Sequence, residues 1–289
     1  MGLTIKELIP IGEKILKDGG VTENAPHDAE ALLGFELGFD KQKIFMNWTY
    51  EPDASHIESY FDLANRRAAG EPLQYITGEQ YFMGHRFVVN PSVLIPRPET
   101  EVLAEKVISL LNESIKAKNV LDLCTGSGAL AISIAKACPR LKITATDISE
   151  EALAVARQNA SALSAAGRIN FVQSDLFEEI KTGIFGKKFD LVAVNPPYIK
   201  SADIFSLPRE IKEHEPELAL DGGEDGLAFY RRIAEAIPPY LKANARLITE
   251  IGLGQAQDVS SIFESVGFGN TKLIKDLTGT DRILSFVFL

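Results

Sequence analysis

The amino-acid sequence predicts an α/β protein: a small N-terminal helical domain, then a mostly parallel sheet with helices on both faces, closed by an antiparallel hairpin at its C-terminal edge. Three observations predict this fold class. Before residue 75 the apolar residues recur with helical periodicity. From Glu99 onward strand-like and helix-like runs alternate, as they do in parallel sheets. Near the C-terminus two strand-like runs are joined by a connection too short to hold a crossover helix.

Composition places the chain among ordinary folded proteins. It has 289 residues, of which 45% are hydrophobic and 24% are charged, and this length favours two domains. The formal net charge of −10 opposes attraction to a phosphate backbone, so no stable nucleic-acid partner is expected. No apolar run reaches the roughly 18 residues of a membrane span, and the N-terminus lacks a signal-peptide core. We therefore expect a cytoplasmic protein without membrane contact.

Neither cysteine nor histidine spacing indicates a metal site or a disulfide framework. Cys124 and Cys138 are too few and too far apart in the sequence, and both are expected to be small buried residues. The histidines show no spacing typical of metal ligands; they are His27, His56, His85 and His214. The sequence therefore predicts no metal.

Residues 1–74 are predicted to form a helical bundle, and residues 75–98 a linker. Pro26 suits the start of the second helix of the bundle and Gly38 its end. No cluster of titratable residues suggests chemistry there, so this domain is expected to be a scaffold or a partner-docking module. The linker contains a predicted hairpin, with strands at 80–82 and 86–89, and closes with prolines that stiffen the chain.

Residues 99–289 carry the predicted sheet. Its parallel strands are expected at 119–124, 142–147, 169–175, 190–195 and 246–251. Helices are expected near 129–137, 150–163 and 227–241, and the antiparallel pair at 271–277 and 282–288.

The first of these strands leads into a glycine loop. Cys124, Thr125, Gly126, Ser127 and Gly128 precede an alanine-rich helix, where glycines allow close approach of a ligand and the helix N-terminus offers free N–H groups. Nineteen residues beyond Gly128, Asp147 ends the second strand, where a carboxylate can accept two ribose hydroxyls. An adenosine-bearing cofactor is therefore predicted.

A further acidic residue follows the third strand. Asp175 can accept from an exocyclic amino group, and Leu176 beside it can cover a purine face. A solvated strand-end residue is an equally good interpretation of Asp175. The loop alone does not choose the cofactor, because residues 126–131 also satisfy the dinucleotide pattern G-x-G-x-x-A.

The fourth strand runs directly into Asn195-Pro196-Pro197-Tyr198, which should lie beside the glycine loop. A nitrogen in an amide or aromatic amine is a poor nucleophile, so an enzyme must hold it by both N–H groups. The Asn195 side-chain oxygen and the Pro196 carbonyl supply two acceptors, Pro197 fixes the backbone, and Tyr198 can stack on the planar group. The tetrad indicates methylation of a planar nitrogen, with S-adenosylmethionine as methyl donor.

Three alternatives remain open at this point. An adenine-N6 nucleic-acid methyltransferase shares the amino-group chemistry, but the acidic charge argues against it. A nicotinamide dehydrogenase would leave the tetrad unexplained, the sequence has no Tyr-x-x-x-Lys pair, and the C-terminal antiparallel hairpin is more typical of methyltransferases. A non-catalytic module that senses the cofactor is the third.

Six blocks of sequence resemble the release factor glutamine methyltransferases, the HemK or PrmC family. They are EPLQYITG at 71–78, LIPRPETE at 94–101, the glycine loop, NPPYI at 195–199, EPELALDGG at 215–223 and EIG at 250–252. The resemblance implies a Rossmann-like class I methyltransferase fold at 99–289. It also implies that S-adenosylmethionine methylates the N5 amide of the Gly-Gly-Gln glutamine in class-I peptide chain release factors, leaving S-adenosylhomocysteine.

The resemblance also assigns residues to the substrate. Asn195 and Pro196 would grip the glutamine amide, while the helices of residues 1–74 would help to recognise the release factor. Arg97, Glu99 and Glu101 are candidates for the substrate mouth, although charged residues that open a helix are commonly a solvated face. One departure is Cys124, which stands where the family usually has the first glycine of the loop; we expect a tolerated, slightly shifted loop there.

Overall fold

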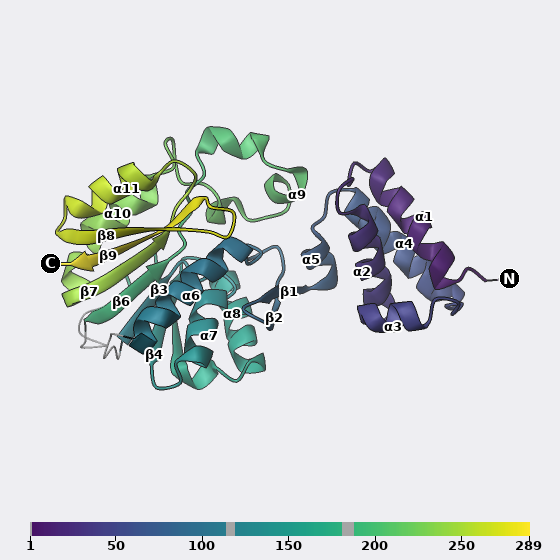
Figure 1. Cartoon of the computed structure of the whole chain (residues 1–289), viewed down its shortest axis with the longest axis horizontal. Coiled ribbons are helices and arrows are strands. Elements are labelled where there is room, and N and C mark those ends of the chain that lie inside the picture. Colours follow the sequence, from purple (N-terminus) through teal and green to yellow (C-terminus); the bar gives the residue numbers. More distant parts are fainter. Residues whose placement is uncertain (1, 114–118, 181–187) are drawn as a thin grey trace. The chain divides into compact units, whose positions relative to one another are not determined.

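The structure, a computed structural model, describes residues 2–113, 119–180 and 188–289 (Figure 1). The chain forms two compact units. The first comprises Met1–Glu79 together with Pro208–His214, and the second comprises Gln80–Leu207 together with Glu215–Leu289. The short segment 208–214 therefore belongs with the helices, although sequence reasoning placed it within 99–289.

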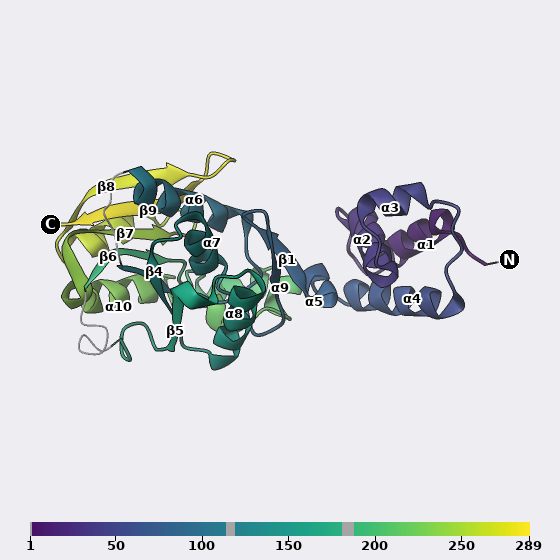
Figure 2. The same cartoon turned by 90° about the horizontal axis from the view of Figure 1, so that it is seen from below.

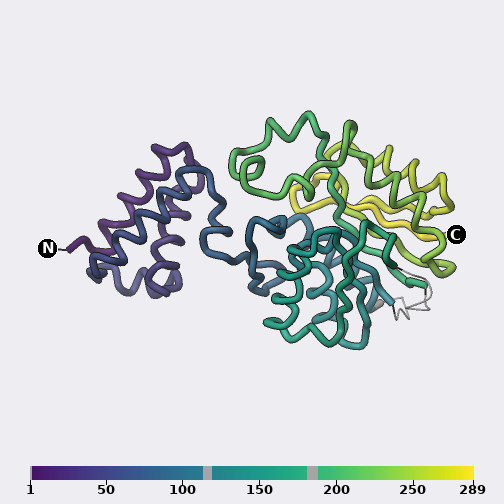
Figure 3. The backbone as a smooth tube through the Cα atoms, turned by 180° about the vertical axis from the view of Figure 1, so that it is seen from behind, coloured from purple at the N-terminus to yellow at the C-terminus, as the bar shows by residue number. Residues whose placement is uncertain are grey.

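The first unit is helical, and its residues up to 79 follow the purple to blue path in Figure 3, whereas its segment 208–214 is green. Leu8, Leu32 and Tyr60 are fully buried where its longer helices pack together. Pro26 lies in the first turn of the second helix, and Gly38 ends that helix in the left-handed conformation, with φ of 61°. The helices are α1 (Ile5–Asp18), α2 (Ala25–Leu37), α3 (Lys41–Met46), α4 (Ala54–Ala68), α5 (Leu73–Thr77) and α9 (Arg209–Lys212).

An ion pair attaches α9 to this unit. The Arg67 guanidinium donates to Asp28 Oδ2 at 2.8 Å, and its other side lies 2.7 Å from Glu210 Oε2. Arg67 is 5% exposed and Asp28 is 3% exposed, so loss of Arg67 would leave the buried Asp28 carboxylate without its guanidinium partner. Segment 208–214 is therefore an integral part of the helical unit.

The second unit is built on a seven-stranded sheet in the order β5-β4-β3-β6-β7-β9-β8. The first five of these strands pair in parallel, and β9 pairs antiparallel with both β7 and β8. A separate hairpin of β1 and β2 precedes the sheet. The strands are β1 (Glu79–Phe82), β2 (His85–Val88), β3 (Asn119–Leu123), β4 (Lys142–Asp147), β5 (Ile169–Gln173), β6 (Phe189–Val194), β7 (Leu241–Glu250), β8 (Phe268–Lys275) and β9 (Asp281–Phe288). The predicted fold class is confirmed.

Helices cover both faces of this sheet (Figures 1 and 2). In β3, Val120 packs in the core under α6 and α7, whereas Leu121 packs in the opposite core under α10 and α11. Alternate residues of one strand thus serve two cores, which explains the nearly continuous apolar runs in the sequence. The helices are α6 (Pro98–Glu113), α7 (Ala129–Ala137), α8 (Glu150–Ala162), α10 (Ala228–Ala236) and α11 (Ala256–Glu264).

Two expectations about elements were wrong. The helix expected at 227–241 ends at Ala236, and β7 starts at Leu241 instead of residue 246. Pro238 and Pro239 cause the change, because they lack the N–H groups that would continue the helix, and a 3-10 turn forms there. Sequence reasoning also missed α11, whose buried Val259 and Phe263 are four residues apart.

Candidate functional site

A cavity of about 390 Å³ opens at the carboxyl ends of the parallel strands in the second unit. This is the edge where α/β proteins bind their ligands. Its wall brings together ten of the residues predicted from the sequence: Arg97, Cys124, Thr125, Gly126, Ser127, Asp147, Asp175, Leu176, Asn195 and Pro197. Residues from four separate strand ends therefore meet in one place.

The glycine loop is held from below by a buried carboxyl group. Thr125 Oγ1 donates to Asp122 Oδ2 at 2.6 Å, and the Ala131 N–H donates to the same oxygen at 3.2 Å. Burial raises the pKa of Asp122 to about 7, and these two hydrogen bonds oppose the rise. Asp122 therefore fixes the loop to the start of α7, although sequence reasoning gave it no role.

Asp147 is oriented by the backbone on either side of it. Its Oδ2 accepts from the Gly126 N–H at 2.8 Å and its Oδ1 from the Ser149 N–H at 3.0 Å. Each carboxylate oxygen has a second lone pair that these bonds leave free. Burial raises the pKa of Asp147, while the backbone hydrogen bonds lower it. The carboxylate is thus preoriented to accept two hydroxyl groups from a ligand in the cavity.

Asp175 lies at the far side of the cavity and has a partner that the sequence did not indicate. Its Oδ2 is 2.7 Å from Arg232 of α10, whose guanidinium lies over the Phe229 ring at 5.6 Å. Leu176 is buried beside it, and Phe229 also lines the cavity. The apolar wall suits a purine face, and acceptance of the purine amino group by Asp175 stays a prediction.

The tetrad follows β6 directly. Asn195 lines the cavity, and Pro196 and Pro197 are buried. Within residues 2–113, 119–180 and 188–289, no donor binds the Asn195 Oδ1 or the Pro196 carbonyl. Two unengaged acceptors on consecutive residues are what an amide NH₂ group requires.

A second segment supports the backbone of the tetrad. The Ile199 N–H donates to the Leu220 carbonyl at 3.0 Å, and the Gly222 N–H donates to the Ile199 carbonyl at 2.7 Å. The Gln255 side chain donates to the Tyr198 carbonyl at 3.0 Å. The conformation of residues 195–199 is therefore set by contacts far away in the sequence.

We expect Gly222→Ala to lower kcat at least about 10-fold and to destabilise the fold by about 1–3 kcal/mol. A Cβ there would lie 2.7 Å from Tyr198 Cα and 2.9 Å from its carbonyl carbon, so the tetrad must move. Thermal unfolding and turnover measure the two effects. Gly167→Ala is the matched control, because its Cβ meets nothing within 4 Å. Equal behaviour of the two variants would contradict this account.

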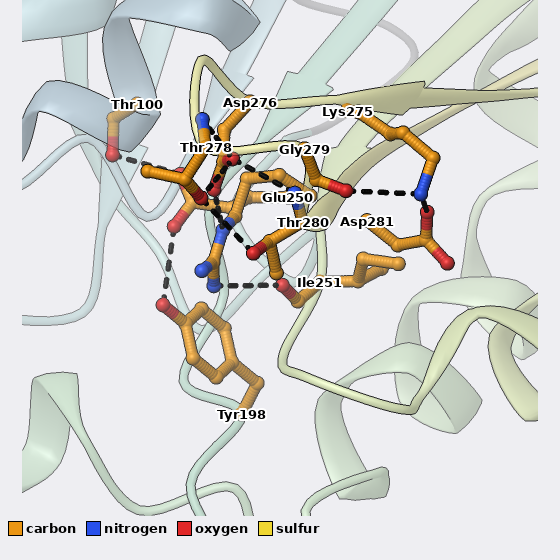
Figure 4. A network of polar contacts seen from close by, with 11 residues as sticks. Thr100, Tyr198, Glu250, Ile251, Lys275, Asp276, Thr278, Gly279, Thr280 and Asp281 are labelled. Carbon is orange, nitrogen blue, oxygen red and sulfur yellow. Dashed lines mark hydrogen bonds and ion pairs between the residues drawn. The ribbon is translucent and has the colours of Figure 1, made fainter.

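Polar contacts behind the tetrad form a connected series, of which Figure 4 shows the contacts among Thr100, Glu250 and Tyr198. Asn195 Nδ2 donates to Thr100 Oγ1 at 3.2 Å, and Thr100 Oγ1 donates to Glu250 Oε2 at 2.7 Å. The Tyr198 hydroxyl donates to the other oxygen, Oε1, at 3.1 Å. Glu250 is 1% exposed; burial raises its pKa to about 7, and the hydrogen bonds from Thr100 and Tyr198 oppose the rise.

Comparison with known proteins identifies the family. A release factor glutamine methyltransferase from Geobacter sulfurreducens is 40% identical over 97% of this chain and 95% of its own length. The chain belongs to the release factor glutamine methyltransferases. A release factor glutamine methyltransferase from Clostridium acetobutylicum is 38% identical over 98% of both chains. The sequence resemblance is thereby confirmed.

Two domain models match this chain, and a solved structure shares its fold. The Methyltransferase small domain model matches residues 99–224, and the PrmC N-terminal domain model matches residues 7–78. A crystal structure of a methyltransferase from Pyrococcus furiosus has a TM-score of 0.51 at 18% identity, covering 71% of this chain and 90% of its own. That likeness shows the methyltransferase fold.

Several predicted residues of this methyltransferase lie away from the cavity wall. Gly128, with φ of 80°, begins α7 behind the loop, and Pro196 is buried. Tyr198 is turned toward Glu250, so its stacking on the substrate stays a prediction. Glu99 is half-buried outside the wall, whereas Arg97 lines it and forms an ion pair with the buried Glu215.

Other wall residues were missed. They are mainly apolar or basic side chains: Leu130, Ile148, Leu218, Phe229 and Arg232. Thr100 and Leu218 were missed although they lie inside the blocks at 94–101 and 215–223 that carry the family resemblance. Ile148, Phe229 and Arg232 lie outside these blocks, and no sequence signal distinguishes them from ordinary helix or loop positions.

Cys124 takes the left-handed conformation, with φ of 58°, which explains the glycine that the family usually has here. We expect Cys124→Gly to be more stable than Cys124→Ala by about 1 kcal/mol, because only glycine escapes the Cβ clash of this conformation. Both variants lose the thiol, so chemical unfolding of the pair isolates the backbone effect. A more stable alanine variant would refute it. Cofactor affinity of the same pair tests the predicted shift of the loop.

Across the described parts of the chain, no three His, Cys, Asp or Glu side chains gather as metal ligands do. None of the helices that the structure describes is long and apolar enough to cross a membrane.

Proposed function

We propose that this chain methylates the N5 amide nitrogen of the Gly-Gly-Gln glutamine in class-I peptide chain release factors, converting S-adenosylmethionine to S-adenosylhomocysteine. The observation that carries the proposal is the pair of unengaged acceptors on consecutive residues, Asn195 Oδ1 and the Pro196 carbonyl. Asn195 lines the cavity that Asp147 and the glycine loop border, and the buried Pro196 follows it directly. Family membership supports the choice of substrate.

The residues present fit the cofactor. Asp147 offers two preoriented acceptors to ribose hydroxyls, and Leu176 and Phe229 offer apolar contact to the adenine. Gly126, with φ of 53°, leaves room for the methionine portion next to the N-terminus of α7. When bound, S-adenosylmethionine supplies an electrophilic methyl group on its sulfonium.

The residues of the protein position the substrate and stabilise the charge that develops during the reaction. Asn195 Oδ1 and the Pro196 carbonyl each accept one N–H of the glutamine amide, which fixes the nitrogen and its lone pair toward the cofactor. The same two carbonyl dipoles stabilise the positive charge that develops on the nitrogen during transfer. No general base has to remove a proton before the transfer. Positioning and two fixed dipoles therefore account for most of the acceleration.

In the same proposal residues 1–74 help to recognise the release factor, 75–98 form the linker and 99–289 perform the chemistry. The match of residues 7–78 to the PrmC N-terminal domain supports the first assignment. The net charge of −10 supports action without a stable nucleic-acid partner. A cytoplasmic location without membrane contact follows from the same substrate, which takes part in translation.

The test uses methyl-labelled S-adenosylmethionine and a purified class-I release factor. We expect label on the factor and none on the same factor with its Gly-Gly-Gln glutamine changed to alanine. An adenine-containing oligonucleotide serves as the third substrate, and label there would favour the adenine-N6 alternative. Equal labelling of both release factors would overturn the assignment of the methylated residue.

A further inference from the structure

Thr100 occupies the centre of the chain of polar contacts behind the tetrad. It lies in the first turn of α6 and is 8% exposed, while Asn195 follows β6 and Glu250 ends β7. Its hydroxyl group joins the other two, at 3.2 Å from Asn195 Nδ2 and 2.7 Å from Glu250 Oε2. Figure 4 shows Thr100 and Tyr198 approaching Glu250 from different sides.

The numbers of donors and acceptors in these contacts fix the direction of each hydrogen bond. Above its pKa of about 7, Glu250 is ionised and its carboxylate only accepts, and it receives the Tyr198 hydroxyl on Oε1. The single hydrogen of the Thr100 hydroxyl is therefore committed to Glu250 Oε2. The Thr100 oxygen can then only accept from Asn195, so the Asn195 nitrogen faces Thr100 and its oxygen faces the cavity.

This direction matters because the two ends of a carboxamide have nearly the same size. Shape alone does not decide whether Asn195 presents oxygen or nitrogen, and the hydrogen-bond partners have to make the choice. In the reversed orientation Asn195 would present N–H donors to the N–H donors of a substrate amide. That arrangement would repel the group that the site has to hold.

We propose that Thr100 and Glu250 are positioning residues that hold the Asn195 carboxamide with its oxygen toward the substrate nitrogen. The inference rests on the proposed function for its substrate, but the orientation of Asn195 is a property of this chain alone.

Charges near Glu250 support this direction of the hydrogen bonds among Asn195, Thr100 and Glu250, which we call the relay. The Arg282 guanidinium favours the ionised carboxylate, whereas Glu99 opposes it. Arg282 is itself held, since its Nη1 donates to the Ile251 carbonyl at 3.4 Å and its Nε lies 3.6 Å from Asp276 Oδ2. Asp276 also accepts from Thr278 Oγ1 at 2.6 Å in the turn between β8 and β9 (Figure 4). The C-terminal hairpin thus places a fixed cation behind the relay.

Thr100→Val tests the proposal, because it removes the hydroxyl and keeps the branched shape. We expect kcat to fall about 30-fold or more, with the cofactor dissociation constant unchanged within about 2-fold. Thr100→Ser keeps the hydroxyl and should retain kcat within about 3-fold of wild type. Thr249→Val is the matched control: Thr249 is fully buried next to Glu250, and its hydroxyl donates to the Glu250 carbonyl, outside the relay.

A double-mutant cycle separates positioning from stability. In an Asn195→Ala background, Thr100→Val should lower kcat less than about 2-fold further, because the group that it orients is gone. An equal loss in both backgrounds would show that Thr100 acts independently of Asn195 and would overturn the proposal. Thermal unfolding of each variant verifies folding, and Thr100→Ala makes the same removal if the valine variant does not fold.

A measurement without substrate keeps the proposal separate from the proposed function. The side-chain amide signals of Asn195 in a ¹H–¹⁵N NMR spectrum are assigned by their absence in Asn195→Ala. We expect Thr100→Val to shift them and Thr100→Ser to preserve them. Unchanged signals in Thr100→Val would refute the positioning role, whereas failure of the wild-type enzyme to label a release factor would refute only the proposed function.

Discussion

Replacing Asn195 by alanine is expected to lower kcat by about 10²–10³-fold while the cofactor dissociation constant stays within about 2-fold of wild type. The substitution removes the side-chain acceptor that we propose for the substrate nitrogen. The Pro196 carbonyl remains, so one N–H of the glutamine amide is still held and the nitrogen can rotate. Single-turnover methylation at saturating cofactor, with calorimetry for cofactor binding, measures both quantities.

The control for this prediction is Asn170→Ala, which removes an exposed asparagine from β5. It should match wild type in both measurements. The assignment would be contradicted by an Asn195→Ala enzyme with wild-type turnover. It would equally be contradicted by a variant whose whole defect lies in cofactor binding, because Asn195 would then serve the cofactor alone.

Asp147→Ala is expected to weaken cofactor binding by roughly 10²–10⁴-fold, because the two charge-assisted hydrogen bonds proposed to the ribose would be lost and each is worth about 1.5–3 kcal/mol. The loop itself also loses the contact between Asp147 Oδ2 and the Gly126 N–H. At saturating cofactor, kcat should recover to within about 10-fold of wild type, since the tetrad is untouched. Isothermal titration with S-adenosylmethionine measures the change in affinity.

Glu178→Ala provides the control for the loss of negative charge. Glu178 is exposed, follows β5 and does not line the cavity, so its removal changes the charge without changing a contact. If this variant weakened binding as much as Asp147→Ala does, general attraction to the cationic cofactor would explain both results. The ribose assignment would then fail.

The parallel strands could be predicted from the sequence because burial on both faces leaves an unbroken apolar run. β4 has the predicted bounds, and β3 ends one residue early, where Cys124 turns into the left-handed region. The predicted helix after residue 227 was too long, because the apolar periodicity continues past Pro238 and Pro239, where the helix cannot continue. α11 was missed because its apolar face consists mainly of Val259 and Phe263.

The candidate site could be predicted only where a contact is local or where strand ends must converge. The glycine loop, Asp147 and Asn195 meet because they end neighbouring parallel strands. The contact between Thr100 and Glu250 joins residues that are 150 positions apart. The sequence around a single buried threonine does not indicate which distant residue it contacts. The ion pair between Asp175 and Arg232 spans 57 positions and escaped prediction for the same reason.

The grouping of segment 208–214 with the helices restricts how this protein can be recombined with its relatives. A chimera that exchanges residues 1–79 alone would separate Arg67 from its own Glu210, and the buried guanidinium would have to accept whatever residue the foreign segment offers. Functional exchange of the helical unit therefore needs three crossovers, at 79/80, 207/208 and 214/215, so that the distant segment is exchanged with it. A functional chimera should therefore take residues 67 and 210 from the same parent protein.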